Sequence, residues 1–383
     1  MRLGIISDCV HIQKSDGSVG TETHILLYQL QALADHFDEV VVACPFISFN
    51  EKQIATYYSD KKFSFIPLPN VGGNGMMNKL QLLKTIPNWW RAFKQIDKRS
   101  DIVYQRFPNN LNIPGFFYFY FKKKKVFATY TGTWLNYKNE PFTYRLQKWV
   151  LKKYFRGPVW AYLDKPGNDD KIKMGFSPSY SKKIWEEETA QVQKRLERLK
   201  QEGLKTLKLI NVGAFVPNKN QLFILNTCIE LKRLNIPFYL ILVGDGFLKE
   251  TYRHFIEQNN LSTSVTIAGK KTADELRQLY RENDFVVQAP VQEGFGKVPI
   301  EGFFHGLIPI LSDVALAKTM TADNRGFIFS LKEEHSLVEL LQNLQYQQTT
   351  LPAMILNGRA FAATQTLEAW ASEYAATIHA WVA

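Results

Sequence analysis

"FVVQAPVQEGFGKVPIEGFFHGLIPILS", residues 285–312, begins and ends with a short apolar run and holds a glycine-rich loop and a helical stretch between them. Both apolar runs have the length of buried strands. Pro299 is tolerated in a helix only within the first turn, so we expect the helix to begin at Lys297 or Val298. Gly306 is expected to end it. A strand, a helix and a second strand in this order predict a parallel sheet with helices packed on it.

The same alternation continues along the whole chain. Strand-like runs are "RLGIIS", "VVVACPF", "FSFIPLP", "DIVYQRF", "KVFATYTG" and "VWAYL" in the first half, and "TLKLINVG", "FYLILVGDG", "SVTIAG", "FVVQAP", "IPILS" and "GFIFS" in the second. This repetition predicts an α/β protein with two doubly wound parallel sheets. A polar stretch without a buried strand separates the halves. We therefore expect a first domain at 1–178, a second at 179–360, and a last helix at 361–383 that packs back on the first domain.

Length and composition limit the class of protein. The chain has 383 residues, of which 45% are hydrophobic and 14% aromatic, enough for two globular cores. Its cysteines, Cys9, Cys44 and Cys228, are odd in number and scattered, which indicates neither a disulfide framework nor a zinc site. The chain opens on a strand-like run and has no apolar stretch of membrane-spanning length. We expect a cytoplasmic protein, attached at most peripherally to the inner face of the membrane.

The charge is unevenly distributed. Residues 51–200 carry 29 basic and 12 acidic side chains, a balance of +17, whereas residues 201–383 carry 16 and 18, a balance of −2. The first half is therefore expected to face something acidic. No helix-turn-helix, zinc-finger or RNP-like pattern supports nucleic acid, which favours an anionic membrane surface or a phosphorylated acceptor. The segment "LQKWVLKKYFRGPVW" suits such an interface because cations alternate with aromatic rings: Lys148, Lys152, Lys153 and Arg156 with Trp149, Tyr154 and Phe155.

The aromatic run "PGFFYFYFKKKK" has two interpretations. It could be an interfacial anchor, because four lysines follow the rings. The apolar part is short, however, and lies between two predicted strands, where a connecting helix must pack on the sheet. This position favours a core helix.

Two acids stand on either side of the predicted helix start. Glu293 lies in the loop, and Glu301 is expected in the opening turn of the helix. Glu301 could act only on the helix dipole, an effect of about 0.3–1 kcal/mol. The glycines favour a more specific interpretation, because Gly294 and Gly296 let backbone N–H groups approach a ligand at a helix N-terminus. This pattern predicts a phosphorylated ligand between two acids.

Other predicted strand ends add candidates at the same edge, since parallel sheets bind ligands beyond their carboxyl ends. Each has a plain alternative as a turn, a helix cap or a solvated lysine. In the second half the candidates are Gly213, Lys219, Asp245, Gly246, Lys270 and Lys271. In the first half they are Gly17 and Gly20, ahead of a helix with Thr21 as its expected cap and Glu22 in its first turn.

Together, the runs "VGAFVPNKNQ", "LVGDG" and "DELRQLYRENDFVVQAPVQEGFGKVPIEGFFHG" resemble the donor-binding half of retaining glycosyltransferases with the GT-B fold, specifically glycosyltransferase family 4. The E-x7-E spacing of that family is matched by Glu293 and Glu301. The resemblance covers about 207–330, and in the first half only "VGTETH" looks like the family's glycine-rich loop. It implies two Rossmann-like domains facing a central cleft, with the acceptor bound by the first and the donor by the second.

The resemblance also implies roles for the matched residues. Glu293 would hold hydroxyls of the donor sugar, Glu301 would hold the ribose hydroxyls, and Lys219 would neutralise the leaving group. Gly20 would let the first domain close over the phosphates. The remaining donor-binding candidates are Gly213, Lys270, Gly294, Phe295, Gly296, Lys297 and Val298. No metal or cofactor is expected apart from the donor, a nucleotide diphosphate sugar for which UDP is favoured.

The chain departs from the family pattern in three places. Ala214 stands where the family usually has Arg, "TYTGTW" offers Thr131, Gly132 and Thr133 where it often has His, and its double glycine is reduced to Val19 and Gly20. We expect Lys297 to replace the missing Arg. The predicted reaction is retaining transfer of a sugar to a hydroxyl of a saccharide or lipid-linked acceptor, in bacterial polysaccharide or glycolipid synthesis. An inactive paralogue that acts as a binding partner, and a nucleotide-sugar epimerase of the same fold, stay open.

Overall fold

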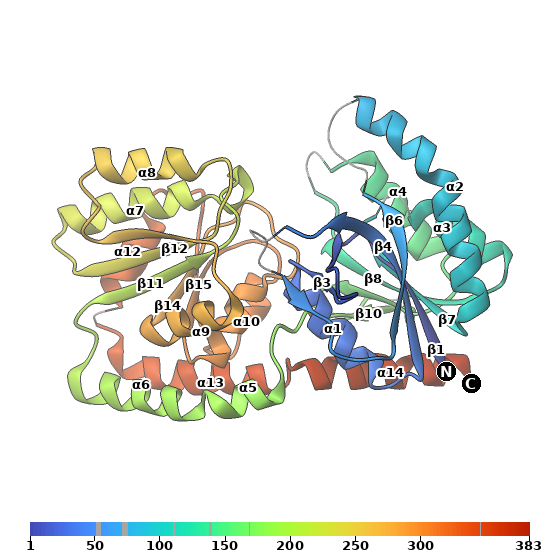
Figure 1. Ribbon diagram of the computed structural model, residues 1–383. Coiled ribbons are helices and arrows are strands. Elements are labelled where there is room, and N and C mark those ends of the chain that lie inside the picture. The colour runs from blue at the N-terminus through green and yellow to red at the C-terminus, as the bar shows by residue number, and fades with distance from the viewer. Residues whose placement is uncertain (51–54, 71–75, 110–111, 138–139, 168, 345) are drawn as a thin grey trace. The chain divides into compact units, whose positions relative to one another are not determined.

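The computed structural model describes residues 1–50, 55–70, 76–109, 112–137, 140–167, 169–344 and 346–383. The chain forms two compact units, Met1–Ser179 with Leu367–Ala383 as unit 1, and Tyr180–Thr366 as unit 2. Each unit is built on a sheet with helices on both of its faces (Figure 1). The predicted α/β class with two parallel sheets is confirmed.

The sheet of unit 1 has the strand order β10-β9-β8-β7-β1-β4-β2-β3-β5, and β6 pairs with β4. Most of its strands are parallel: β1 (Arg2–Ile6), β4 (Glu39–Ser48), β6 (Phe63–Pro69), β7 (Ile102–Phe107), β8 (Lys125–Thr133), β9 (Val159–Tyr162) and β10 (Ile172–Met174). Three short strands, β2 (His11–Gln13), β3 (Val19–Thr21) and β5 (Thr56–Tyr57), extend it through antiparallel β2–β3 and β3–β5 pairs. These short strands were not predicted. β10 was missed as well, since it lies in the polar stretch that was expected to contain no buried strand, where it pairs with β9.

Helices cover both faces of this sheet. The apolar core on one face includes residues from α2 (Met76–Arg99), α3 (Asn112–Phe121) and α4 (Phe142–Lys153). The core on the other face includes residues from α1 (His24–Ala34) and α14 (Leu367–Val382). The helix α3 is the aromatic run considered above, and its Phe116 and Phe119 are buried as a core helix requires.

The last helix packs back on unit 1, as predicted. Tyr374 of α14 stacks on Trp160 of β9, with 3.8 Å between ring centroids. Both rings are fully buried, and a buried aromatic pair of this kind adds about 0.5–1.5 kcal/mol beyond the burial of its area. The helix begins at Leu367, and residues 361–363 belong instead to the end of α13 (Leu351–Ala363) in unit 2.

The predicted start of the first helix was wrong. Thr21 is the last residue of β3 and Glu22 follows it, whereas α1 begins at His24 with Thr23 as its N-cap. The Thr21 hydroxyl donates to the Val10 carbonyl at 2.9 Å and accepts a bond from the Thr23 N–H at 3.1 Å. Pairing with Thr56 of β5 therefore makes Thr21 part of a strand and not the cap of the helix.

Unit 2 has an all-parallel sheet of order β13-β12-β11-β14-β15-β16. The strands are β11 (Leu207–Val212), β12 (Phe238–Val243), β13 (Val265–Gly269), β14 (Phe285–Gln288), β15 (Ile308–Ser312) and β16 (Phe327–Phe329). The helices are α5 (Lys182–Glu187), α6 (Thr189–Glu202), α7 (Gln221–Arg233), α8 (Lys249–Gln258), α9 (Ala273–Glu282), α10 (Lys297–Phe304), α11 (Ala317–Thr321), α12 (Ser336–Asn343) and α13, with short 3₁₀ turns η1 (Pro217–Lys219) and η2 (Gln348–Thr350).

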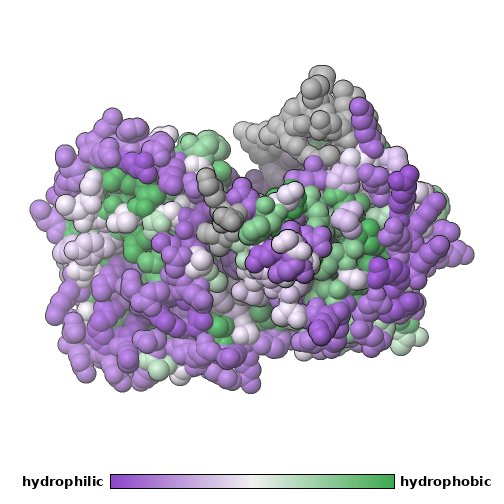
Figure 2. All heavy atoms as spheres, in the orientation of Figure 1, coloured by the Kyte–Doolittle hydropathy of each residue, from purple (hydrophilic) through white to green (hydrophobic). Residues whose placement is uncertain are grey.

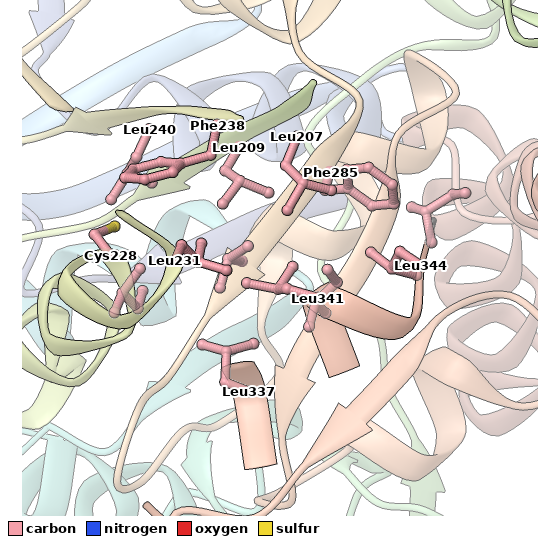
Figure 3. Close-up of a cluster of buried hydrophobic side chains, with 14 of the residues drawn as sticks. Leu207, Leu209, Cys228, Leu231, Phe238, Leu240, Phe285, Leu337, Leu341 and Leu344 are labelled. Atoms are coloured by element: carbon pink, nitrogen blue, oxygen red, sulfur yellow. The ribbon is translucent and has the colours of Figure 1, made fainter. Parts of the chain in front are cut away.

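Alternate residues of the central strands build two cores in unit 2, as the period of a strand requires. On one face Leu207, Leu209 and Leu240 gather with Cys228 and Leu231 of α7 (Figure 3). On the other, Ile210, Val243 and Val286 pack with Tyr280 of α9. The outer surfaces of α5 and α6 are mainly hydrophilic (Figure 2). The sheet is thus covered on both faces, which explains the continuous apolar runs seen in the sequence.

Candidate functional site

The loop between β14 and α10 is the centre of the candidate site. α10 begins at Lys297, and Gly306 with φ +70° follows its end, both as predicted. Gly296 precedes the helix with φ +76° and ψ 76°, a conformation that disfavours any residue with a side chain. As at any helix N-terminus, the first N–H groups of α10 make no hydrogen bond within the helix, so they form a local site for an anion.

A second loop is fixed against the first. The Asn218 side chain donates to the Gln292 carbonyl at 2.8 Å, and the Val291 N–H donates to the Asn218 carbonyl at 2.9 Å. Asn218 lies in η1, directly before Lys219. These two bonds hold the loops after β11 and β14 together at the carboxyl ends of neighbouring strands.

Lys219 and Glu293 form an ion pair between these two loops. The Lys219 ammonium donates to Glu293 Oε2, and Glu293 Oε1 accepts from the Gly294 N–H at 3.1 Å. Both side chains are 26% exposed. The structure thus brings the two predicted catalytic residues together, with their charges in reach of solvent.

Glu301 lies in a different environment. It is the fifth residue of α10, so its predicted place in the opening turn was wrong. An interaction with the helix dipole, which acts on the first turn, is therefore not sufficient to explain an acid at this position. Its side chain is buried, and its Oε2 accepts a hydrogen bond of 2.8 Å from the Tyr280 hydroxyl. Burial, and then the charge of Glu301, raise the pKa of Tyr280 well above its usual value, so the hydroxyl stays a donor at neutral pH.

Tyr280 connects Glu301 to a buried ionic network that the sequence did not reveal. Its ring stacks on His305 with 5.2 Å between centroids, and His305 Nδ1 lies 3.1 Å from Glu188 Oε2. Arg277 and Arg281 each donate to Glu188 at 2.7 Å. One feature of the sequence could have indicated this network: the four-residue spacing of the two arginines, which puts both on one face of α9.

The pKa shifts of Glu188 and His305 determine which of the two is charged at neutral pH. Burial alone would raise the pKa of Glu188, but hydrogen bonds from His305, Arg281 and Arg277 hold it well below its usual value of 4.5. Burial lowers the pKa of His305 despite the neighbouring carboxylate. At neutral pH Glu188 is therefore charged and His305 is neutral.

The other predicted residues of unit 2 follow the carboxyl ends of β11, β12 and β13. Gly213 directly follows β11, and the Lys219 side chain lies close to it, since a Cβ added there would lie 3.6 Å from Lys219 Cγ. Asp245 and Gly246 make a turn in which the Gly246 N–H donates to Asp245 Oδ1 at 2.9 Å. That bond, and then Lys249 and Lys270, lower the pKa of Asp245. Lys270 is exposed after β13.

Several departures from the family pattern can be placed. Ala214 is exposed, Lys297 is partly exposed, and the Thr131 hydroxyl donates to the Phe107 carbonyl at 3.1 Å. Gly20 lies in β3 of unit 1, where a Cβ would meet the Thr56 carbonyl oxygen at 2.5 Å. The close β3–β5 pairing accounts for this glycine, and its role beside the phosphates stays a prediction. Among the described residues, no cluster of His, Cys, Asp and Glu is placed to hold a metal ion.

Comparison with known proteins relates most of unit 2 to a known family. Residues 193–361 match the family described as glycosyl transferases group 1. An uncharacterised glycosyltransferase of Methanocaldococcus jannaschii is 29% identical over 143 residues, which cover 36% of this chain and 39% of that protein. The chain thus matches less than half the length of its curated relatives.

The fold is shared over the full length of solved structures. HepE of Anabaena, solved with UDP and glucose, has a TM-score of 0.70 at 15% identity, with 99% of each chain covered. WaaG, a glycosyltransferase involved in lipopolysaccharide biosynthesis, has a TM-score of 0.66 at 14% identity, covering 98% of this chain and 99% of that one. The fold is therefore that of GT-B glycosyltransferases, and the predicted resemblance is confirmed at this level.

The buried network predicts acid sensitivity of unit 2. Glu188 is more acidic in the folded than in the unfolded chain, so its stabilisation is complete above its unfolded pKa of 4.5 and is lost as the pH falls towards its folded pKa. The lowered pKa of His305 acts in the same direction below 6.5. We expect the free energy of unfolding, measured by urea denaturation, to fall between about pH 6 and about pH 3.

The variant Glu188→Gln tests whether Glu188 causes this dependence of the free energy of unfolding on pH. It should be less stable at pH 7, because the partly exposed Arg277 and Arg281 lose their buried counter-charge. Its free energy of unfolding should depend less on pH below pH 4.5, because an amide does not take up a proton there. Glu250→Gln, which changes an exposed partner of Arg253, should leave the slope unchanged. A Glu188→Gln slope equal to that of the wild type would show that other carboxylates cause the acid sensitivity.

Proposed function

We propose that this chain, whose residues 193–361 match the glycosyl transferases group 1 family, transfers a sugar from a nucleotide diphosphate sugar to a hydroxyl acceptor. Two acids carry the proposal, one on the glycine-rich loop and one on the helix that follows it. Glu293 of the loop forms a partly exposed ion pair with Lys219 of η1, and Glu301 of α10 is buried and bound by Tyr280. A UDP-sugar is the favoured donor, supported by the UDP complex of the structurally similar HepE.

Each part of the site has a role in this proposal. The backbone from Phe295 to Val298 donates to the diphosphate at the N-terminus of α10. Glu301 accepts the two ribose hydroxyls, since a carboxylate can accept hydrogen bonds from a diol, and the Tyr280 hydroxyl fixes its orientation. Glu293 holds hydroxyls of the donor sugar. Gly213 and Lys270 border the nucleotide.

The Lys219–Glu293 pair prepares both side chains for the reaction. An incoming diphosphate competes with Glu293 for the Lys219 ammonium, since both are anions. The ammonium then neutralises charge that develops on the leaving phosphate, and Glu293 becomes available to the sugar. Because the pair is partly exposed, this exchange has a small desolvation cost.

We propose that the transfer retains the anomeric configuration, as in family 4. The bond from the anomeric carbon to the leaving phosphate breaks on the same face on which the acceptor hydroxyl attacks. The departing phosphate takes the hydroxyl proton, so the chain needs no nucleophile of its own. No metal or further cofactor has a part in this scheme.

The acceptor we propose is a saccharide or a lipid-linked saccharide of bacterial polysaccharide or glycolipid synthesis. The fold shared with WaaG, which is involved in lipopolysaccharide biosynthesis, supports this class. Release of nucleoside diphosphate that depends on an acceptor, with a new glycosidic bond, supports transfer. Nucleotide binding without release would indicate an inactive paralogue, and interconversion of sugars an epimerase.

The two acids should separate binding from turnover. UDP at about 100 times its dissociation constant should stabilise the protein by about 2.7 kcal/mol, measured as a thermal shift. Glu301→Ala should abolish this shift, because the ribose hydroxyls lose their acceptor. Glu293→Ala should keep the shift and lose turnover.

Glu301→Gln is the control for folding, since an amide oxygen still accepts from Tyr280. It should keep the melting temperature of the free protein and bind UDP at least about tenfold more weakly, which is about 1.4 kcal/mol. Full activity and an unchanged UDP shift in all three variants would contradict the assignment.

The variant Lys297→Ala tests whether Lys297 replaces the arginine that the family usually has at the position of Ala214. If its charge stabilises the phosphate mainly in the transition state, Lys297→Ala should reduce kcat more than it weakens UDP binding. Adding Ala214→Arg should restore part of the rate. Lys205→Ala, which changes an exposed lysine before the start of β11, should have no effect. An unchanged rate in Lys297→Ala would assign this lysine to the surface alone.

We also propose that unit 1 docks reversibly on the anionic inner face of the membrane. The described residues contain no helix that is long and apolar enough to cross a bilayer. Exposed aromatic residues on α2, α3 and α4 support a peripheral contact: Trp90, Phe117, Phe121, Phe142 and Trp149. Cations accompany them, since Lys153 lies over the Trp149 ring at 5.9 Å and Arg156 over the Tyr120 ring at 4.2 Å.

Two residues of the predicted interface do not belong to it. Lys148 is buried, and its ammonium lies 2.6 Å from Glu140 Oε1 and donates to Asn136 Oδ1 at 3.1 Å. Phe155 is buried and stacks on Phe116 of α3. The helix period explains Lys148, because α4 must direct part of its surface to the sheet. Phe155 follows the end of α4 and packs into the core of unit 1. Lys152, Lys153 and Arg156 stay in the proposed interface.

Vesicle sedimentation tests this contact. The protein should pellet with phosphatidylglycerol vesicles at low salt and leave them at high salt, since each basic residue contributes about 1 kcal/mol and screening acts over about 8 Å at physiological salt. Phe121→Ala with Trp149→Ala should weaken capture. Phe247→Ala, an equally exposed ring in unit 2, should not. Protein that stays in the supernatant at low salt would contradict a membrane role.

A further inference from the structure

The strands β11 and β14 of unit 2 separate before they end. β11 is paired with β12 as far as Val212, and β14 is paired with β15 as far as Gln288. Between β11 and β14, however, the main-chain pairing ends at Ile210 and Val286, whereas the strands continue to Val212 and Gln288. The order of the sheet reverses at this pair, since β12 and β13 lie on one side of it and β15 and β16 on the other. Parallel sheets bind ligands at such a point.

Two side-chain amides bridge the separated strand ends. The Asn211 amide of β11 donates to the Val287 carbonyl at 2.8 Å, and the Gln288 amide of β14 donates to the Val212 carbonyl at 3.2 Å. Asn211 is 1% exposed and Gln288 is 6% exposed. The bridges are therefore reciprocal and buried, and they join the part of the two strands that the main-chain ladder leaves open.

The two chains leave this point in opposite directions. After β11, the Gly213 N–H donates to the Val243 carbonyl of β12 at 2.9 Å. After β14, the Pro290 carbonyl accepts a bond of 2.9 Å from the hydroxyl of Ser312, the last residue of β15. One loop is thus held on β12 and the other on β15. The two side-chain amides oppose this separation and fix its width.

The width of this gap bears directly on the Lys219–Glu293 ion pair. The side chain of Lys219 lies against Gly213, where an added Cβ would be 3.6 Å from its Cγ and 3.7 Å from its Cδ. Gly213 directly follows Val212, whose carbonyl is bound by Gln288. Glu293 lies on the other loop, which begins after Gln288. A change in the gap would therefore move the ammonium relative to the carboxylate.

We propose that Asn211 and Gln288 are positioning residues for sugar transfer, because they fix the gap between β11 and β14 and so place Lys219 against Glu293. This inference rests on the proposed function and concerns residues to which that function gives no role. Both amides act through the loops, without contact with the ligand. Their effect on the rate can be large, since a misplacement of about 1 Å can cost about 100-fold. Glu301 is oriented separately by Tyr280, so nucleotide binding should not depend on the amides.

Near-isosteric variants remove each bridge with little change in volume. Gln288→Met and Asn211→Leu should each lower kcat at least about tenfold, which is about 1.4 kcal/mol. Turnover is followed as release of UDP from UDP-glucose. The thermal shift caused by UDP should stay as in the wild type. A purely structural role would lower the melting temperature and leave the kcat of the folded protein unchanged.

A matched control removes the same kind of bond elsewhere in unit 2. Asn259 follows the end of α8, and its side-chain amide donates to the Phe255 carbonyl at 2.8 Å. Asn259→Leu should therefore leave kcat unchanged.

A second background tests whether the bridge acts through the lysine. In Lys219→Ala protein, adding Gln288→Met should change kcat less than about twofold, because the group that it positions is absent.

Hydrogen–deuterium exchange gives a readout that needs no turnover. The backbone amides of 213–219 and 289–294 should exchange faster in Gln288→Met and in Asn211→Leu than in the wild type, and not in Asn259→Leu. If the wild-type protein releases no UDP with any acceptor, the proposed function fails. Faster exchange in the two variants would then still support the fixed gap, and unchanged exchange would overturn it.

In an active protein, three results would overturn the inference. The first is an unchanged kcat in folded Gln288→Met and Asn211→Leu. The second is loss of the UDP shift together with kcat, which would indicate a general disturbance of unit 2. The third is a full effect of Gln288→Met in the Lys219→Ala background.

Discussion

The parallel register of the sheet in unit 2 is the constraint on which the candidate site depends. Leu209 pairs with Phe285 and Phe285 with Ile308, so β11, β14 and β15 end at one edge. Loops far apart in the sequence therefore meet there, and the two hydrogen bonds between Asn218 and the 291–292 backbone fix their relative position. Without this register, Lys219 and Glu293 could not form an ion pair across 74 positions of sequence.

Features that follow local rules could be predicted from the sequence. Pro299 and Gly306 fix the ends of α10 because each restricts the backbone at its own position. The start of the helix at 24–34 was predicted wrongly because the structure just before it depends on a distant contact. Thr21 belongs to a strand through pairing with Thr56, a contact over 35 positions that no local pattern contains.

Burial of charged groups was the harder part of the prediction. A count of lysines and aromatic residues placed Lys148 on an interface, whereas its ammonium is held inside unit 1 by Glu140. The bond from Tyr280 to Glu301 was missed in the same way, since a tyrosine in the polar run "ADELRQLYRE" has no local mark of its partner. Such pairs exist because a buried charge needs a partner, and the partner is chosen by the fold.

The two acids of the loop and helix differ in what the fold allows them to do. Glu301 is enclosed, and Tyr280 is itself held between Glu301 and the His305 ring, so any movement of this carboxylate would break a buried hydrogen bond. Glu293 lies on a loop, is 26% exposed, and can exchange Lys219 for water at little cost. A rigid acid suits the part of a ligand that stays unchanged through a reaction. A movable acid beside a lysine suits the part where bonds and charges change, and this difference is the physical reason for assigning binding to Glu301 and turnover to Glu293.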